Sequence, residues 1–265
     1  MSRETVRRWS AESASARGVV LIVHGMGDYS GRHAGLAHAL AAGGFDVVAG
    51  DLRGHGVASG ARGHAERWDE LLEDVESWWR VASSPEPVFV LGESMGGLVA
   101  LDWALAHPER VGALVLAAPA FRPGFDPPAW KLALARVAQG VVPGLAQKTG
   151  IGGAMISRAR EEADAFDQDP LTHQWMTARF FALYRAAAAR LVASGPRVAW
   201  PTLVLGAGDD RVVSMPAIRA FAASNPGRIE LREYAGAYHG LFHDLPDVRR
   251  AVIEDLLTFL QRNVT

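Results

Sequence analysis

Short runs of β-branched and other apolar residues alternate along this chain with longer segments of helical periodicity, and turn residues separate the two kinds. Strands that alternate with helices in this way predict an α/β fold, with a mostly parallel central sheet flanked by helices. The predicted strands are 19–23, 45–49, 88–91, 113–117, 202–205 and 229–234, with an edge strand at 5–9. The predicted helices are 32–42, 68–82, 95–106, 216–223 and 246–261.

The alternation stops between residues 120 and 195, where the chain is rich in Pro, Gly, Ala and Arg and shows no convincing strand. Helical patterns in this stretch cover 128–139, 157–166 and 171–193. We therefore expect an all-helical cap inserted over the carboxyl edge of the sheet, where open α/β folds bind their ligands. The chain then divides into a core, residues 1–119 and 196–265, and a cap, residues 120–195.

The most specific motif is Gly92-Glu93-Ser94-Met95-Gly96, which lies between a predicted strand and a predicted helix. A serine at a sharp strand-to-helix turn, with glycines that let the strand and helix pass close together, is typical of a nucleophile elbow. A Gly-rich turn with an incidental serine would match the same five residues. The interpretation therefore depends on the partners of Ser94.

A serine hydroxyl becomes a nucleophile when an imidazole accepts its proton and a carboxylate orients the imidazole. His239 follows the last predicted strand in a loop of small residues and is the candidate base. His243, nearer the last helix, is interpreted as a solvated or capping residue. Asp209 and Asp210 follow the preceding strand, and spacing alone does not separate them. The order Ser, Asp, His is that of α/β-hydrolases.

Acyl transfer also needs two backbone N–H groups directed at the developing oxyanion. One is expected from Met95, directly after the nucleophile at the start of a helix. The second is expected from the loop after strand 19–23, where Met26 is the best candidate. His24 in the same loop is interpreted as structural.

The composition of the chain mainly excludes certain partners and kinds of site. The 265 residues carry a formal net charge of −2 without a visible basic patch, so no nucleic-acid partner is expected. The absence of cysteine excludes disulfides, thiolate metal sites and a cysteine nucleophile, and no metal or cofactor is expected. The amino-terminal residues do not resemble a secretory signal, and no run is apolar enough to span a bilayer. We expect a cytoplasmic protein that is a monomer or a weak homo-oligomer.

These residues together resemble the monoacylglycerol lipase and lysophospholipase group of α/β-hydrolases, which is grouped with serine aminopeptidase-like (S33) sequences. The matching pieces are 24–32, 51–56, the elbow, 169–171 and 236–239. The resemblance implies that Asp210, which Arg211, Val212 and Val213 follow, is the triad acid, and that Met26 and Met95 form the oxyanion hole. We also expect Gly25 and Glu93 to border the substrate. Glu93 departs from the pattern, because many relatives have His there.

The predicted function is hydrolysis of carboxylic esters, foremost monoacylglycerols or related medium- to long-chain acyl esters, by a Ser94-His239-Asp210 triad. Lysophospholipase and general carboxylesterase activities are the nearest alternatives. An aminopeptidase or a C–C bond hydrolase would use the same triad and ranks lower, and a non-catalytic binding module ranks last. Apolar cap residues favour transient contact with a membrane surface, although a buried cap core explains them equally well. These residues are Trp130, Val141, Val142 and Leu145.

Overall fold

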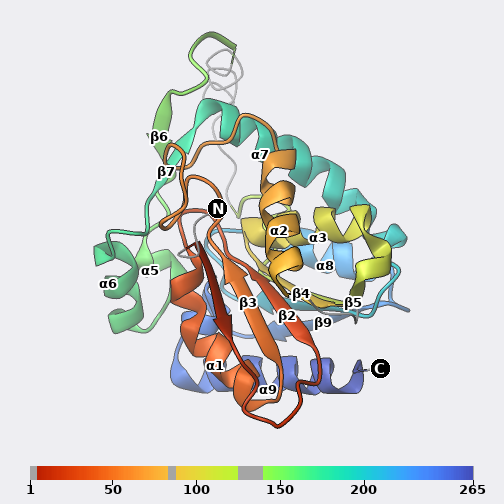
Figure 1. Ribbon diagram of the computed structural model, residues 1–265. Helices are drawn as coiled ribbons and strands as arrows, with labels where there is room; N and C mark the ends of the chain where they lie inside the picture. Colours follow the sequence, from red (N-terminus) through yellow and green to blue (C-terminus); the bar gives the residue numbers. More distant parts are fainter. Residues whose placement is uncertain (1–4, 83–87, 125–139, 265) are drawn as a thin grey trace.

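Seven strands form one central sheet in a computed structural model that describes residues 5–82, 88–124 and 140–264. The strand order is β1-β3-β2-β4-β5-β8-β9, and every neighbouring pair is parallel except β1 and β3 (Figure 1). The strands are β1 (Val6–Trp9), β2 (Val19–Val23), β3 (Asp46–Gly50), β4 (Val88–Glu93), β5 (Val111–Ala117), β8 (Thr202–Ala207) and β9 (Ile229–Tyr234). The predicted fold class, a mostly parallel sheet flanked by helices, is confirmed.

Helices cover both faces of the sheet because its strands are apolar on both sides. Along β2, for example, Leu21 packs into one core cluster, whereas Val20 and Ile22 pack into the other. Helices α1 (Ala34–Ala42) and α9 (Pro246–Arg262) cover the Val20 face, and α2 (Asp69–Ala82), α3 (Met95–Ala106) and α8 (Met215–Ala223) cover the Leu21 face (Figure 1). Both faces are therefore sealed, and the parallel strands present their carboxyl ends at one edge.

The insertion between β5 and β8 is not all-helical, so that expectation was wrong. A two-stranded antiparallel ribbon, β6 (Ala146–Lys148) with β7 (Trp175–Thr177), lies beside α5 (Gly153–Ile156), α6 (Arg160–Gln168) and α7 (Ala178–Leu191). The helix expected over 171–193 begins only at Ala178, because the side chain of Thr177 accepts a hydrogen bond from the Phe180 N–H and caps it. The helix expected over 128–139 lies outside the described residues.

Several polar contacts fasten the insertion to the core, including ion pairs of two arginine side chains of the insertion, Arg158 and Arg190. Arg190 on α7 donates to both carboxylate oxygens of Asp102 on α3. Near α6, Arg158 donates through Nε and its backbone N–H to the buried carboxylate of Asp244, at 3.0–3.1 Å. Asp244 lies in the loop that leads into α9, so this second contact ties the insertion to the end of the chain that carries His239. Within the described segments, no helix is long and apolar enough to cross a membrane.

Candidate active site

Ser94 lies at the turn between β4 and α3 with backbone angles φ 56° and ψ −120°. A positive φ is strained for a residue with a side chain, and such strain persists only where the surrounding structure fixes it. Here the Ser94 N–H donates to the Ala117 carbonyl at 2.9 Å, and its carbonyl accepts from Gly97 and Ala120 at 3.0 and 3.1 Å. Ser94 therefore has the backbone conformation and the support that a nucleophile elbow requires.

The glycines of the elbow allow three backbones to pass close to one another. A Cβ atom on Gly92 would lie 2.3 Å from the Gly96 carbonyl oxygen, and one on Gly96 would lie 2.2 Å from the Val23 carbonyl oxygen. Gly25, expected beside the substrate, faces the nucleophile, because a Cβ there would lie 3.1 Å from Ser94 Cβ. The loop after β2, which is expected to hold an oxyanion donor, and the elbow after β4 are thus in direct contact.

His239 and Asp210 are brought together by the loops after β9 and β8. Asp210 Oδ2 is 2.8 Å from His239 Nδ1, and Oδ1 accepts the backbone N–H groups of Val212 and Val213 at 2.8 Å each. Asp209 is exposed. The structure therefore separates the two aspartates that spacing left open, since only Asp210 contacts the histidine.

Both members of this pair are buried, and their charges act on each other. Burial lowers the pKa of His239, but the carboxylate of Asp210 and, more weakly, that of Glu93 outweigh it, so the pKa lies above its ordinary value. Among the described residues, no hydrogen bond joins Ser94 Oγ to the His239 ring. Catalytic hydrogen bonds of this kind are often long in free enzymes and tighten when substrate binds.

One of the two expected oxyanion donors belongs to the elbow, and the other belongs to the loop after β2. Met95 is the first residue of α3, where the helix dipole favours negative charge. Met26 lies in the loop after β2, which His24 supports by accepting the Leu52 N–H at Nε2, at 2.9 Å. The cap also holds this loop, because the His173 N–H donates to the Gly27 carbonyl at 2.9 Å.

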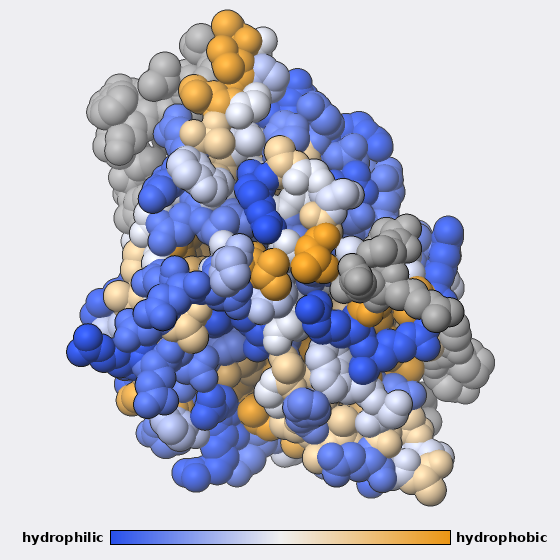
Figure 2. Space-filling model, turned by 60° about the vertical axis from the view of Figure 1, so that its left-hand side comes forward, coloured by the Kyte–Doolittle hydropathy of each residue, from blue (hydrophilic) through white to orange (hydrophobic). Residues whose placement is uncertain are grey.

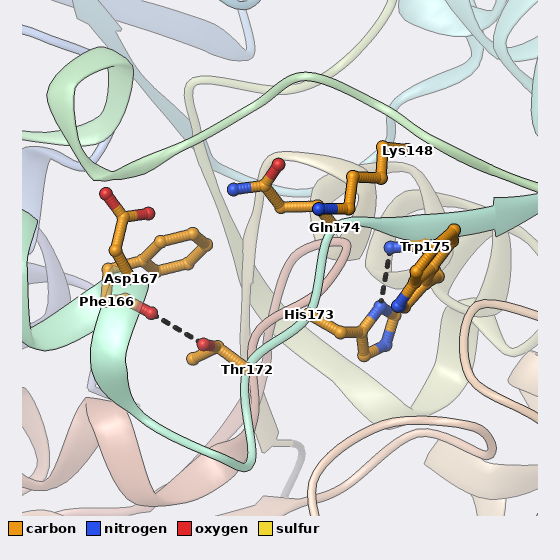
Figure 3. A pocket seen from close by; sticks show the side chains of 7 residues that line it. All are labelled: Lys148, Phe166, Asp167, Thr172, His173, Gln174 and Trp175. Carbon is orange, nitrogen blue, oxygen red and sulfur yellow. Dashed lines mark hydrogen bonds between the residues drawn. The ribbon is translucent and has the colours of Figure 1, made fainter.

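A cavity of about 200 Å³ lies within the cap, and His173, which holds the loop at Gly27, is one of the residues that line it. Figure 3 shows side chains from α6, β6 and the segment before β7 around it. Burial lowers the pKa of His173 to about 4, so its ring is neutral near pH 7. The residues around the cavity are Lys148, Phe166, Asp167, Thr172, His173, Gln174 and Trp175. Sequence patterns did not single out this cavity, because its residues come from α6, β6 and the segment that leads into β7, which lie apart in the sequence.

Glu93 and His243 are both buried, so the interpretation of His243 as a solvated residue was wrong. Glu93, expected to border the substrate, is buried, and its carboxylate faces His33. His243, interpreted as solvated or capping, is also buried and belongs to the same cluster. Burial raises the pKa of Glu93, although the nearby His243 partly opposes this shift.

The sheet order, the elbow and the acid–histidine pair define an α/β-hydrolase. The serine aminopeptidase S33 family pattern matches residues 14–246. The chain belongs to this family, and it is a carboxylic ester hydrolase.

Similar proteins agree with this assignment. This chain is 31% identical to phospholipase YtpA of Bacillus subtilis over 243 residues, which cover 89% of this chain and 92% of that protein. It is 27% identical to the monoglyceride lipase of Rattus norvegicus, over 97% of this chain and 86% of that protein. The crystal structure of Paleococcus ferrophilus monoacylglycerol lipase superimposes with a TM-score of 0.86 at 28% identity, covering 96% of this chain and 98% of that one.

Proposed function

We propose that Ser94, His239 and Asp210 form a catalytic triad that hydrolyses acyl esters of glycerol through an acyl-enzyme. The observation that supports this most is the 2.8 Å contact between His239 and Asp210, beside a serine held at a positive φ. A buried carboxylate on Nδ1 fixes the tautomer in which Nε2 is unprotonated and can accept a proton.

In this mechanism, Ser94 Oγ attacks the ester carbonyl carbon while His239 Nε2 takes the hydroxyl proton. The oxyanion accepts hydrogen bonds from the backbone N–H groups of Met26 and Met95. The tetrahedral intermediate then expels the glycerol alkoxide, which leaves with the proton from His239. A water molecule, deprotonated by the same ring, attacks the acyl-enzyme and releases the fatty acid and Ser94.

Monoacylglycerols are the proposed substrate class, because relatives over nearly the whole chain are named monoglyceride lipases. Phospholipase YtpA, at 31% identity, supports a lysophospholipid as the second candidate. Both substrates carry one acyl chain on glycerol, so the head group is what distinguishes them. We propose that residues 120–195 form a cap that determines which of the two head groups is bound.

We also propose that the cap tip contacts lipid surfaces transiently. Val141, Val142 and Leu145 are 75%, 51% and 44% exposed, and Trp175 is 41% exposed. Figure 2 shows a hydrophobic patch at the tip of the molecule, where the β6 end of the cap projects in Figure 1. Trp130, assigned to the same surface from the sequence, lies outside the described residues. Flotation with phosphatidylcholine liposomes tests this contact, and equal recovery of wild type and Val141→Asp would contradict it.

The triad is tested with Ser94→Ala against Ser59→Ala, an exposed loop serine, as the matched control. Ser94→Ala is expected to lose turnover of p-nitrophenyl esters and labelling by a fluorophosphonate, whereas Ser59→Ala keeps both. A panel of monoacylglycerols of increasing chain length, lysophosphatidylcholine and aminoacyl anilides then ranks the substrates. Preference for the anilides would overturn the esterase assignment in favour of a peptidase.

A further inference from the structure

Three buried side chains from distant segments face one another behind the nucleophile. His33 ends the 3₁₀ turn η2 (Ser30–His33), Glu93 ends β4, and His243 ends the 3₁₀ turn η5 (Leu241–His243). One nitrogen or oxygen atom from each lies within 4.8 Å of the other two, and His33 Nδ1 is 3.8 Å from Glu93 Oε2. The three residues are 0%, 5% and 8% exposed. His33, Glu93 and His243 thus form a buried His-Glu-His cluster.

Four of the six side-chain nitrogen and oxygen atoms of this cluster have no hydrogen-bond partner among the described residues. Both ring nitrogens of His33, Oε2 of Glu93 and Nε2 of His243 have no hydrogen bond among the described residues. Buried polar atoms in native proteins are nearly always paired, and several unpaired atoms at one point indicate a missing ion or water. An ion or water molecule bound between the three residues would supply the partners that these atoms lack.

Carboxylates outside the cluster face the second nitrogen of each ring. His33 Nε2 lies 3.6 Å from Asp28 Oδ2, and His243 Nδ1 lies 3.4 Å from Glu162 Oε2. Histidines that bind metals usually have such an outer carboxylate, which fixes the tautomer and directs the other nitrogen at the ion. The inner nitrogens, Nδ1 of His33 and Nε2 of His243, remain for the centre of the cluster.

The charges around the cluster favour a cation. Two arginines pair with the outer carboxylates, since Arg32 lies 3.1 Å from Asp28 and Arg249 lies 3.1 Å from Glu162. Among the described residues no arginine forms an ion pair with Glu93, although Arg32 acts on its carboxylate at longer range. Three carboxylates, those of Asp28, Glu93 and Glu162, therefore face two arginines.

We propose that His33, Glu93 and His243 bind one divalent transition-metal ion, with zinc as the best match. Two imidazoles and one carboxylate are a donor set that zinc uses, with a water molecule in the fourth position. Magnesium and calcium are disfavoured because they require mainly oxygen ligands. Tetrahedral zinc bonds place ligand atoms about 3.3 Å apart, so the 3.8 Å pair must approach by roughly half an ångström, and a pair at the 4.8 Å limit of the cluster by about 1.5 Å.

The position of the cluster gives the ion a structural role. His33 follows the loop that carries Met26, Glu93 precedes Ser94, and His243 is close behind His239. An ion bound by all three would cross-link the oxyanion loop, the elbow and the histidine loop. Because the ligands meet only in the folded chain, the ion would also stabilise the native state.

Metal content and stability test this proposal without reference to activity. Protein stripped with EDTA and gel-filtered after addition of zinc is expected to hold one zinc per chain by mass spectrometry. Its melting temperature is expected to rise with zinc concentration. Cobalt(II) in place of zinc is expected to give the visible absorption bands of a tetrahedral site. Wild-type protein that retains no metal, or a crystal structure with a water molecule at the centre, would overturn the proposal.

Variants locate the ion within the protein. His33→Asn and His243→Asn are expected to lose the zinc, whereas His38→Asn, at an exposed histidine on α1, is expected to retain it. Glu162→Gln keeps all three ligands but removes an outer carboxylate, and zinc affinity is expected to fall by about 10- to 100-fold. Circular dichroism confirms folding of each variant, and unchanged zinc content in folded His243→Asn would exclude this site. If the two ligand variants do not fold, Glu162→Gln and the cobalt spectrum decide.

Discussion

Replacing Asp210 with Asn should abolish most of the activity while leaving the fold intact. The carboxylate accepts two backbone N–H groups at Oδ1 and faces His239 Nδ1 with Oδ2. In Asp210→Asn, the amide oxygen must accept the two backbone N–H groups. An NH₂ group in that position would place its own N–H donors against backbone donors, and no hydrogen bond could form. The NH₂ group therefore faces His239 and forces Nδ1 to accept. The ring proton then moves to Nε2, which can no longer take a proton from Ser94.

The expected loss in kcat is about 10⁴-fold, equivalent to about 5 kcal/mol of transition-state stabilisation. The loss in stability is much smaller, since one charge-assisted hydrogen bond contributes about 1.5–3 kcal/mol. Chains of this size lose roughly 2–4 °C in melting temperature per kcal/mol, so the variant stays folded at 25 °C.

Asp209→Asn is the matched control, because it removes the same charge from the neighbouring, exposed position. Both variants are compared by turnover of a p-nitrophenyl ester, with thermal denaturation as the test of folding. Asp209→Asn is expected to stay within a few-fold of wild type. An Asp210→Asn enzyme that keeps a tenth of its kcat, or an equal loss in both variants, would refute the triad as drawn.

Three further substitutions test other parts of the structure. Glu93→Gln removes a charge that raises the pKa of His239, so the acid limb of the kcat/KM profile should move to lower pH; an unmoved limb would argue against this coupling. Gly96→Ala should lower the free energy of unfolding in urea by about 3 kcal/mol because its Cβ meets a carbonyl oxygen, whereas Gly35→Ala in α1, where the space is open, should not. The pKa of Asp244 is lowered because its arginine partner and backbone N–H groups outweigh the effect of burial. Its stabilisation is therefore present above the unfolded pKa of about 4 and lost as the pH falls further. Asp244→Asn should lower stability by about 2 kcal/mol at pH 7 and flatten the acid side of a melting-temperature profile, and a parallel profile would contradict this.

The inner strands of the sheet were predictable because they are buried on both faces and form nearly unbroken apolar runs, such as Val19–Val23. The elbow was predictable for a related reason, since its glycines are fixed by backbone contacts that only glycine permits. The ribbon of β6 and β7 was missed because each strand has three residues, mostly exposed, and exists only through pairing with a distant segment.

Long-range geometry also explains what the sequence left open at the site. Asp209 and Asp210 are equivalent by spacing; the family resemblance implied Asp210, and the contact with His239 distinguishes the two in space. His33 and His243 come from opposite ends of the chain, so no motif spacing links them to Glu93. Their burial follows from the packing of two 3₁₀ turns against the elbow, which periodicity does not encode.

The hydrogen bond from the His173 N–H to the Gly27 carbonyl connects the cap to the loop that carries Met26. A Cβ at Gly27 would lie 2.0 Å from the His173 carbonyl oxygen, so the two backbones are in direct contact. Any displacement of this part of the cap that breaks the bond also releases the loop next to the reacting carbonyl. If Met26 donates to the oxyanion and substrate enters past the cap, as proposed above, movement of the cap and positioning of this donor are governed by one equilibrium. A ligand that holds the cap away from Gly27 would act as an inhibitor without touching Ser94.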